Sequence, residues 1–131
     1  MIEYSLNKSK IVNKPWGKEE WLELNDHYCY KRIYINNGFR TSLQYHVEKH
    51  ETNYIISGKA KLIIGLDANN LKEYFLSEGD FITIPPGTIH RFVAITDLIL
   101  QEVSTPHVDD CIRIEDDTQR DNGRIESEHT V

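Results

Sequence analysis

Residues 44–51 of this chain read Gln44-Tyr45-His46-Val47-Glu48-Lys49-His50-Glu51, and residues 85–90 read Pro85-Pro86-Gly87-Thr88-Ile89-His90. The first stretch leads into a β-rich run at 54–57, and the second follows another at 81–84. Because side chains alternate between the two faces of a strand, Gln44 and His46 point to the same side. A turn and a second strand can return Glu51 to that side. The spacing predicts that these side chains and His90 converge inside a β-barrel.

The four converging side chains have the chemistry of a metal site. Two imidazoles, a carboxylate and an amide oxygen suit Zn²⁺, Fe²⁺, Mn²⁺, Co²⁺ or Ni²⁺ and leave room for a substrate. We predict one divalent metal ion, with zinc as the first expectation, bound by Gln44, His46, Glu51 and His90. The amide of Gln44 is the weakest donor, and its alternative role is to orient a water molecule or the substrate.

Short β-type segments fill most of the chain. They are rich in β-branched and aromatic residues, and turn residues such as Asn36-Asn37-Gly38 and Glu78-Gly79-Asp80 separate them. We expect strands at 21–24, 28–35, 42–46, 53–57, 59–65, 73–76, 81–84, 90–94 and 98–104. This pattern predicts an all-β sandwich or jelly-roll barrel. Residues 1–12 are expected to form an arm or edge strand, residues 13–120 one domain, and residues 121–131 a flexible tail.

The two stretches also carry a family resemblance. Gly38, Gln44-x-His46, Glu51 and Gly58, followed by Gly79, Pro85-x-Gly87 and His90, resemble in order and spacing the two motifs of the cupin superfamily. The chain departs from the pattern at two places, with Gln44 for the first histidine and Ala94 for a frequent asparagine. The resemblance implies a double-stranded β-helix, or jelly-roll, barrel.

Further segments resemble the isomerase domain of type II mannose-6-phosphate isomerases. They are Lys14-Pro15-Trp16-Gly17, Arg40-Thr41-Ser42-Leu43-Gln44, and the run from Asp109 to Asp117. The resemblance implies a metal-dependent isomerase that interconverts mannose 6-phosphate and fructose 6-phosphate through a cis-enediol. It also implies a homodimer, with Trp16, Trp21 and Tyr28 at an edge or a dimer seam.

Composition excludes several other classes. The 131 residues suffice for one domain with an ordinary core. The net charge of −6 argues against nucleic acid and anionic membranes as partners, but not against a small sugar phosphate. Because no run of about 18 apolar residues and no secretion signal is visible, the expected location is the cytoplasm. Two cysteines, Cys29 and Cys111, are expected to be free thiols.

Several charged residues are candidates for catalysis and substrate binding. Glu102, Glu48 or a metal-activated water can serve as the base that moves a proton. Arg40 shares strand parity with Gln44 and His46, so it is a candidate for the substrate phosphate. Arg91 and Lys61 are further substrate-binding candidates.

Three other functions remain open at this stage. The first is conversion of another modified or nucleotide-linked sugar in polysaccharide synthesis, and the second is small-molecule binding without catalysis. The third is an Fe²⁺ dioxygenase, since two imidazoles and one carboxylate can form a facial triad.

Overall fold

Strands and tight turns make up almost all of the chain from residue 4 to residue 129, the part described by the computed structural model. The elements are β1 (Lys10–Lys14), β2 (Gly17–Leu24), β3 (Cys29–Ile35), β4 (Leu43–His46), β5 (Glu51–Ser57), β6 (Lys59–Gly65), β7 (Lys72–Ser77), β8 (Phe81–Ile84), β9 (Ile89–Ala94), β10 (Leu98–Ser104), β11 (Cys111–Glu115) and the short helix α1 (Glu126–His129).

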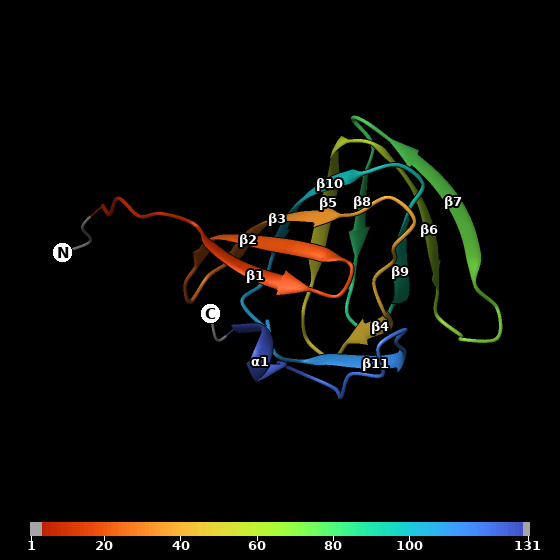
Figure 1. Ribbon diagram of the computed structural model, residues 1–131. Coiled ribbons are helices and arrows are strands. Elements are labelled where there is room, and N and C mark those ends of the chain that lie inside the picture. Colours follow the sequence, from red (N-terminus) through yellow and green to blue (C-terminus); the bar gives the residue numbers. More distant parts are fainter. Residues whose placement is uncertain (1–3, 130–131) are drawn as a thin grey trace.

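The strands form two antiparallel sheets that face each other (Figure 1). One sheet has the order β1-β2-β3-β10-β5-β8, and the other has the order β11-β4-β9-β6-β7. Strands distant in sequence thus lie side by side, as in the pairing of β10 with both β3 and β5. The prediction of an all-β jelly-roll barrel is confirmed.

The apolar core fills one end of the space between the sheets. Its members alternate with outward residues along each strand, as a pleated sheet requires. They are Trp16, Ile33, Ile35, Ile55, Ala60, Leu62, Ile84, Phe92, Ala94, Leu98 and Leu100. On β8 the inward residues are Ile82 and Ile84, which leaves Phe81 66% exposed.

The hairpin formed by β1 and β2 packs against the barrel through Trp16 and Gly17. Trp16 is buried in the core rather than placed at an edge or seam, and its carbonyl accepts a hydrogen bond from Asn36 N at 2.9 Å. Gly17 has φ of 155°, and a Cβ there would lie 2.0 Å from the carbonyl oxygen of Tyr34. The close approach of β2 to β3 therefore requires glycine at this position.

The chain ahead of β1 projects away from the barrel, with Tyr4 and Leu6 almost fully exposed, whereas α1 near the other end of the described chain lies beside β1 (Figure 1). Residues 10–14 form the edge strand β1, in which Val12 is fully buried. Residues 121–129 differ from the flexible tail that their polar sequence predicts. They end in α1, where Glu128 forms an ion pair with Lys14 and the ring of His129 meets Trp21 edge-on. Residues 1–3 and 130–131 lie outside the described part.

Within residues 4–129, no helix is long and apolar enough to cross a membrane.

Candidate metal centre

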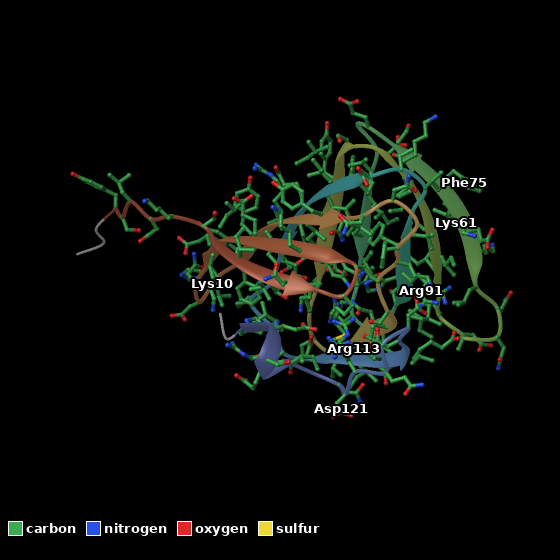
Figure 2. All side chains as sticks on the ribbon, in the orientation of Figure 1. Lys10, Lys61, Phe75, Arg91, Arg113 and Asp121 are labelled. Atoms are coloured by element: carbon green, nitrogen blue, oxygen red, sulfur yellow. The ribbon has the colours of Figure 1, made fainter. Side chains whose placement is uncertain are left out.

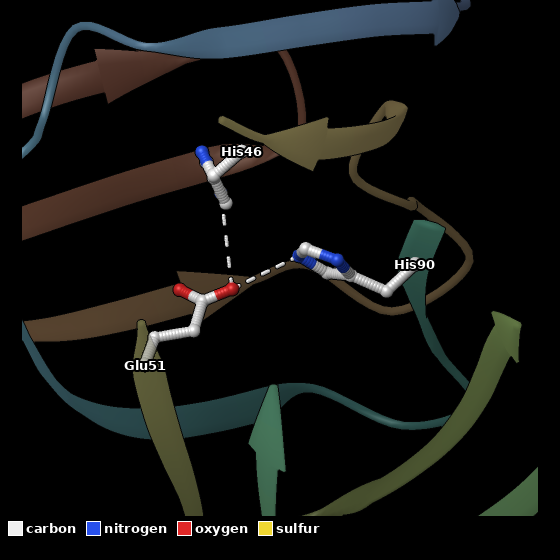
Figure 3. Close-up of side chains that lie close together, drawn as sticks. All are labelled: His46, Glu51 and His90. Carbon is white, nitrogen blue, oxygen red and sulfur yellow. Dashed lines mark ion pairs between the residues drawn. The ribbon is translucent and has the colours of Figure 1, made fainter. Parts of the chain in front are cut away.

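Three of the predicted ligands meet inside the barrel, in a pocket that core residues also line. His46 closes β4, Glu51 opens β5, and His90 lies on β9 (Figure 3). Glu51 Oε1 lies 3.0 Å from His90 Nε2 and 3.8 Å from His46 Nε2. All three side chains are buried, and their candidate donor atoms lie within 4.8 Å of one another. Two imidazoles and one carboxylate at this separation fit a single divalent cation.

The far side of each imidazole is fixed by a hydrogen bond. His90 Nδ1 donates to the carbonyl of Thr88 at 2.9 Å, and His46 Nδ1 lies 3.2 Å from Asp110 Oδ1. Asp110 is itself held by the backbone N–H groups of Glu48 and Lys49. A partner at Nδ1 selects the tautomer in which Nε2 carries the free lone pair. Both Nε2 atoms are therefore presented toward Glu51.

The pKa values of the two histidines shift in opposite directions. Burial lowers the pKa of His46 to about 4, so this ring is neutral at pH 7 and able to bind a metal. Burial also acts to lower the pKa of His90, but the hydrogen bond and the charge of Glu51 outweigh burial and raise this pKa. The carboxylate that a metal would share with His90 thus also favours the protonated form of this ring.

Gln44 lies directly opposite His90 in the pairing of β4 with β9. Its Oε1 accepts hydrogen bonds from Ser42 Oγ at 2.6 Å and from Cys111 Sγ at 3.2 Å, while its Nε2 lies 3.4 Å from His46 Nε2. The amide nitrogen, not the oxygen, faces the histidines in this arrangement. Ligation by Gln44 requires its amide to turn over, which exchanges two groups of nearly equal size.

A buried group of charges adjoins the three ligands. Lys49 Nζ lies 2.9 Å from Glu102 Oε2 and 3.2 Å from Glu51 Oε2, and all three side chains are almost fully buried. The sequence made Glu102 a catalytic candidate, and the structure turns its side chain toward the barrel interior. Lys49 was missed, although alternation along Lys49-His50-Glu51 places Lys49 on the side of Glu51 and His50 on the other.

The pKa values of the two carboxylates in this group, Glu102 and Glu51, shift in opposite directions. Burial, together with the nearby charge of Glu51, raises the pKa of Glu102 to about 7 against the opposing effect of Lys49. Burial also acts to raise the pKa of Glu51, but Lys49 and His90 outweigh it and hold this pKa well below the usual range. Glu51 is therefore the permanent anion of the pair.

One pocket joins the metal centre to this group, and residues of β1, β2 and β11 also line it. Its volume is about 100 Å³, which is room for several water molecules or for part of a small polar ligand. Although the chain is acidic overall, six Lys and Arg residues line the pocket: Lys14, Lys31, Lys49, Arg113, Arg120 and Arg124. His129 also lines it.

The predicted phosphate ligands lie elsewhere. Arg40 is exposed and forms two hydrogen bonds with Asp117, at 2.9 and 2.8 Å. Its parity with Gln44 fails because β4 begins only at Leu43. Arg91 is buried, but its Nε donates to the Thr41 carbonyl at 2.9 Å, on the opposite face of β9 from His90.

Two other candidates also point away from the pocket. The side chain of Glu48 is 67% exposed and lies 3.4 Å from His107 Nε2, in the turn that connects β4 to β5. Lys61 pairs with Glu73 across the β6–β7 ladder at 3.5 Å. None of Glu48, Lys61, Arg40 and Arg91 is among the residues that line the pocket.

Solved structures show the same barrel at low sequence identity. The capsular polysaccharide assembling protein CapF from Staphylococcus aureus superimposes with a TM-score of 0.73 at 18% identity, covering 84% of this chain and 32% of CapF. A Bacillus subtilis oxalate decarboxylase mutant superimposes with a TM-score of 0.69 at 17% identity, covering 80% and 30% of the two chains. At such identity the likeness establishes the cupin fold alone.

Relatives found by sequence similarity indicate the family of this chain more specifically than the solved structures do. A putative mannose-1-phosphate guanylyltransferase from Vibrio cholerae is 30% identical over 108 residues, which is 79% of this chain and 22% of the relative. The alginate biosynthesis protein AlgA from Pseudomonas aeruginosa is 27% identical over 110 residues, 80% and 22% of the two chains. The chain thus spans about a fifth of the length of these relatives. Residues 3–116 match the family described as "Mannose-6-phosphate isomerase C-terminal", and the chain therefore belongs to that family.

Proposed function

We propose that this domain is a metal-dependent isomerase that interconverts mannose 6-phosphate, or a related sugar phosphate, with its ketose. The observation that carries the proposal is the position of Glu102, whose buried carboxylate lines the same pocket as the three candidate metal ligands. Membership of the isomerase family supports the choice of reaction and substrate.

The metal would be held by His46, Glu51 and His90, with Gln44 as a fourth donor once its amide has turned. A bound divalent ion would supply a Lewis acid next to the carbonyl and the neighbouring hydroxyl of the sugar. The donor set fits this task because nothing in it is a soft sulfur ligand and because both imidazoles present Nε2 to one point.

Glu102 is the proposed proton carrier. Aldose–ketose isomerisation moves one proton from the carbon beside the aldehyde to the aldehyde carbon, and moves another between the two oxygens. In the proposal, Glu102 accepts the carbon-bound proton, an enediol forms, and Glu102 returns the proton to the neighbouring carbon. Lys49 holds the carboxylate in position at 2.9 Å, and the buried walls exclude bulk water.

The test is conversion of mannose 6-phosphate to fructose 6-phosphate by protein loaded with Zn²⁺, Co²⁺, Mn²⁺ or Ni²⁺. Glu102→Gln should lower kcat by about 100-fold or more while the metal content stays unchanged. Glu48→Gln, at the exposed candidate, should leave kcat unchanged. Absence of conversion with all four metals would remove the proposal.

A second candidate function is action on a nucleotide-linked sugar. The names of the sequence relatives favour it, because they describe guanylyltransferases of mannose 1-phosphate and proteins of alginate and xanthan biosynthesis. Calorimetric titration with GDP-mannose distinguishes the two candidates. Tight binding of GDP-mannose without conversion of mannose 6-phosphate would favour the second.

A further inference from the structure

The segment after β11 contributes Arg120, Gly123, Arg124 and His129 to the lining of the pocket. Asn122 and Gly123 of this segment are hydrogen-bonded to β11. Arg113 N donates to Asn122 Oδ1 at 2.7 Å, and Gly123 N donates to the carbonyl of Cys111 at 2.8 Å. Figure 2 shows Arg113 and Asp121 on this side of the barrel. The segment ends in α1, a four-residue helix with no buried residue. Little apolar surface therefore holds its last turn in place.

Glu128 of α1 bridges two cations that line the pocket. Its Oε1 lies 2.7 Å from Lys14 Nζ, and its Oε2 accepts from Arg120 Nη1 at 3.1 Å. The three side chains are only 10 to 11% exposed. Arg120 is oriented independently of Glu128, because its Nε and Nη2 donate to both oxygens of Asp116. Lys14 Nζ and Arg120 Nη1 thus share the Glu128 carboxylate.

We propose that Lys14 and Arg120 form a binding site for a phosphate monoester, which the Glu128 carboxylate occupies in the free protein and leaves when the phosphate binds. The proposal rests on the proposed function, in that the substrate carries a phosphate. Removing Glu128 alone would leave the nearly buried donors Lys14 Nζ and Arg120 Nη1 without the anion that they share, which is costly. A phosphate carries about −1.5 to −2 charges at pH 7 and binds guanidinium groups well, so it can replace the carboxylate without that cost.

The exchange would make the pocket selective for phosphorylated sugars. A tethered carboxylate competes with an effective concentration that reaches millimolar values for short linkers, so a weakly bound neutral sugar cannot displace it. A phosphate can, because it forms stronger charge-assisted hydrogen bonds with the same two donors. The ion pairs of Glu128 would then hold the segment 121–129 in place until a phosphate replaces this carboxylate.

Calorimetric titration of the metal-loaded full chain with inorganic phosphate tests the exchange. Glu128→Gln keeps the shape of the side chain and removes its charge, so phosphate should bind about fivefold or more tightly than to the unmodified protein. Lys14→Met should weaken phosphate binding by about tenfold or more, since one of the two cations is lost. The control is Glu73→Gln, because Glu73 is 55% exposed and pairs with Lys61 away from the pocket; it should leave phosphate binding unchanged.

Hydrogen exchange supplies a second readout. Saturating phosphate should speed amide exchange in residues 121–129 of the unmodified protein, because the ion pairs of Glu128 with Lys14 and Arg120 are then broken. The proposal is overturned if Glu128→Gln leaves phosphate affinity unchanged or lowers it, or if phosphate slows exchange in that segment. Phosphate bound at the metal would be insensitive to both Glu128→Gln and Lys14→Met. Loss of isomerase activity with the phosphate results intact would remove the proposed function and leave this site standing.

Discussion

Lys49 binds one oxygen of Glu51 and leaves the other for the histidines. Its Nζ lies 3.2 Å from Oε2, whereas Oε1 lies 3.0 Å from His90 Nε2 and 3.8 Å from His46 Nε2. The carboxylate therefore cannot rotate freely, and one defined oxygen faces both imidazoles. A metal entering this site would find its donors already oriented, which reduces the entropy lost on binding.

Replacement of Lys49 by Met should destabilise the metal-free protein strongly. The change leaves Glu51 and Glu102 buried without their shared cation, and breaking a buried pair in this way costs about 3 kcal/mol or more. Added Zn²⁺ should recover part of the loss, since a cation then neutralises Glu51. Urea unfolding measures both effects. Lys61→Met, at a partly exposed ion pair, is the control and should change stability by less than about 0.5 kcal/mol. Equal stability of Lys49→Met and the unmodified protein would show that this buried ion network is unimportant.

Glu19 should make stability depend on pH in the acid range. Burial acts to raise its pKa, but Lys31 and Lys14 outweigh burial and lower the pKa from 4.5 to about 2. The lowered pKa stabilises the fold fully above pH 4.5, and this contribution is lost as the pH falls toward 2. Urea unfolding at several pH values should show Glu19→Gln less stable at about pH 6, with the difference shrinking by up to about 3 kcal/mol toward about pH 2. A difference independent of pH would contradict this account of Glu19.

Gly17→Ala should be far more damaging than Gly79→Ala. Both glycines have positive φ, 155° and 93°, but a Cβ at Gly17 meets the Tyr34 carbonyl while Gly79 has open space around it. Gly79→Ala should therefore cost only the conformational strain, about 1 kcal/mol, and Gly17→Ala about 3 kcal/mol or more. Thermal unfolding compares the two. Similar melting temperatures would mean that β2 and β3 separate easily at this point.

The fold and the convergence of His46, Glu51 and His90 were predictable because both depend on alternation along strands. His46, Glu51 and His90 each lie in a strand, so their sides follow from residue parity and from the turns between the strands. Gln44 is also in β4, but the direction of its amide depends on Ser42 and Cys111, and no spacing rule specifies such contacts.

Counting odd and even positions along the chain did not predict the positions of side chains that lie outside strands. Arg40 precedes β4, so counting back from Gln44 gave the wrong side, and it pairs with Asp117 instead. The polar sequence of 121–129 carries no hydrophobic periodicity, and its position depends on ion pairs such as Lys14–Glu128 across 114 residues. Pairings at that separation are properties of the folded barrel and leave no local pattern in the sequence.

Metal titration tests the central claim most directly, namely that His46, Glu51 and His90 bind one divalent ion. Isothermal titration of the metal-free protein with Zn²⁺ should give one ion per chain. His46→Ala should lower the affinity by about 100-fold or more without loss of the β-sheet circular dichroism signal. His50→Gln, at the exposed histidine beside Glu51, should bind like the unmodified protein. Equal affinity in His46→Ala and the unmodified protein, or no binding by either, would contradict the metal centre and with it the proposed isomerase.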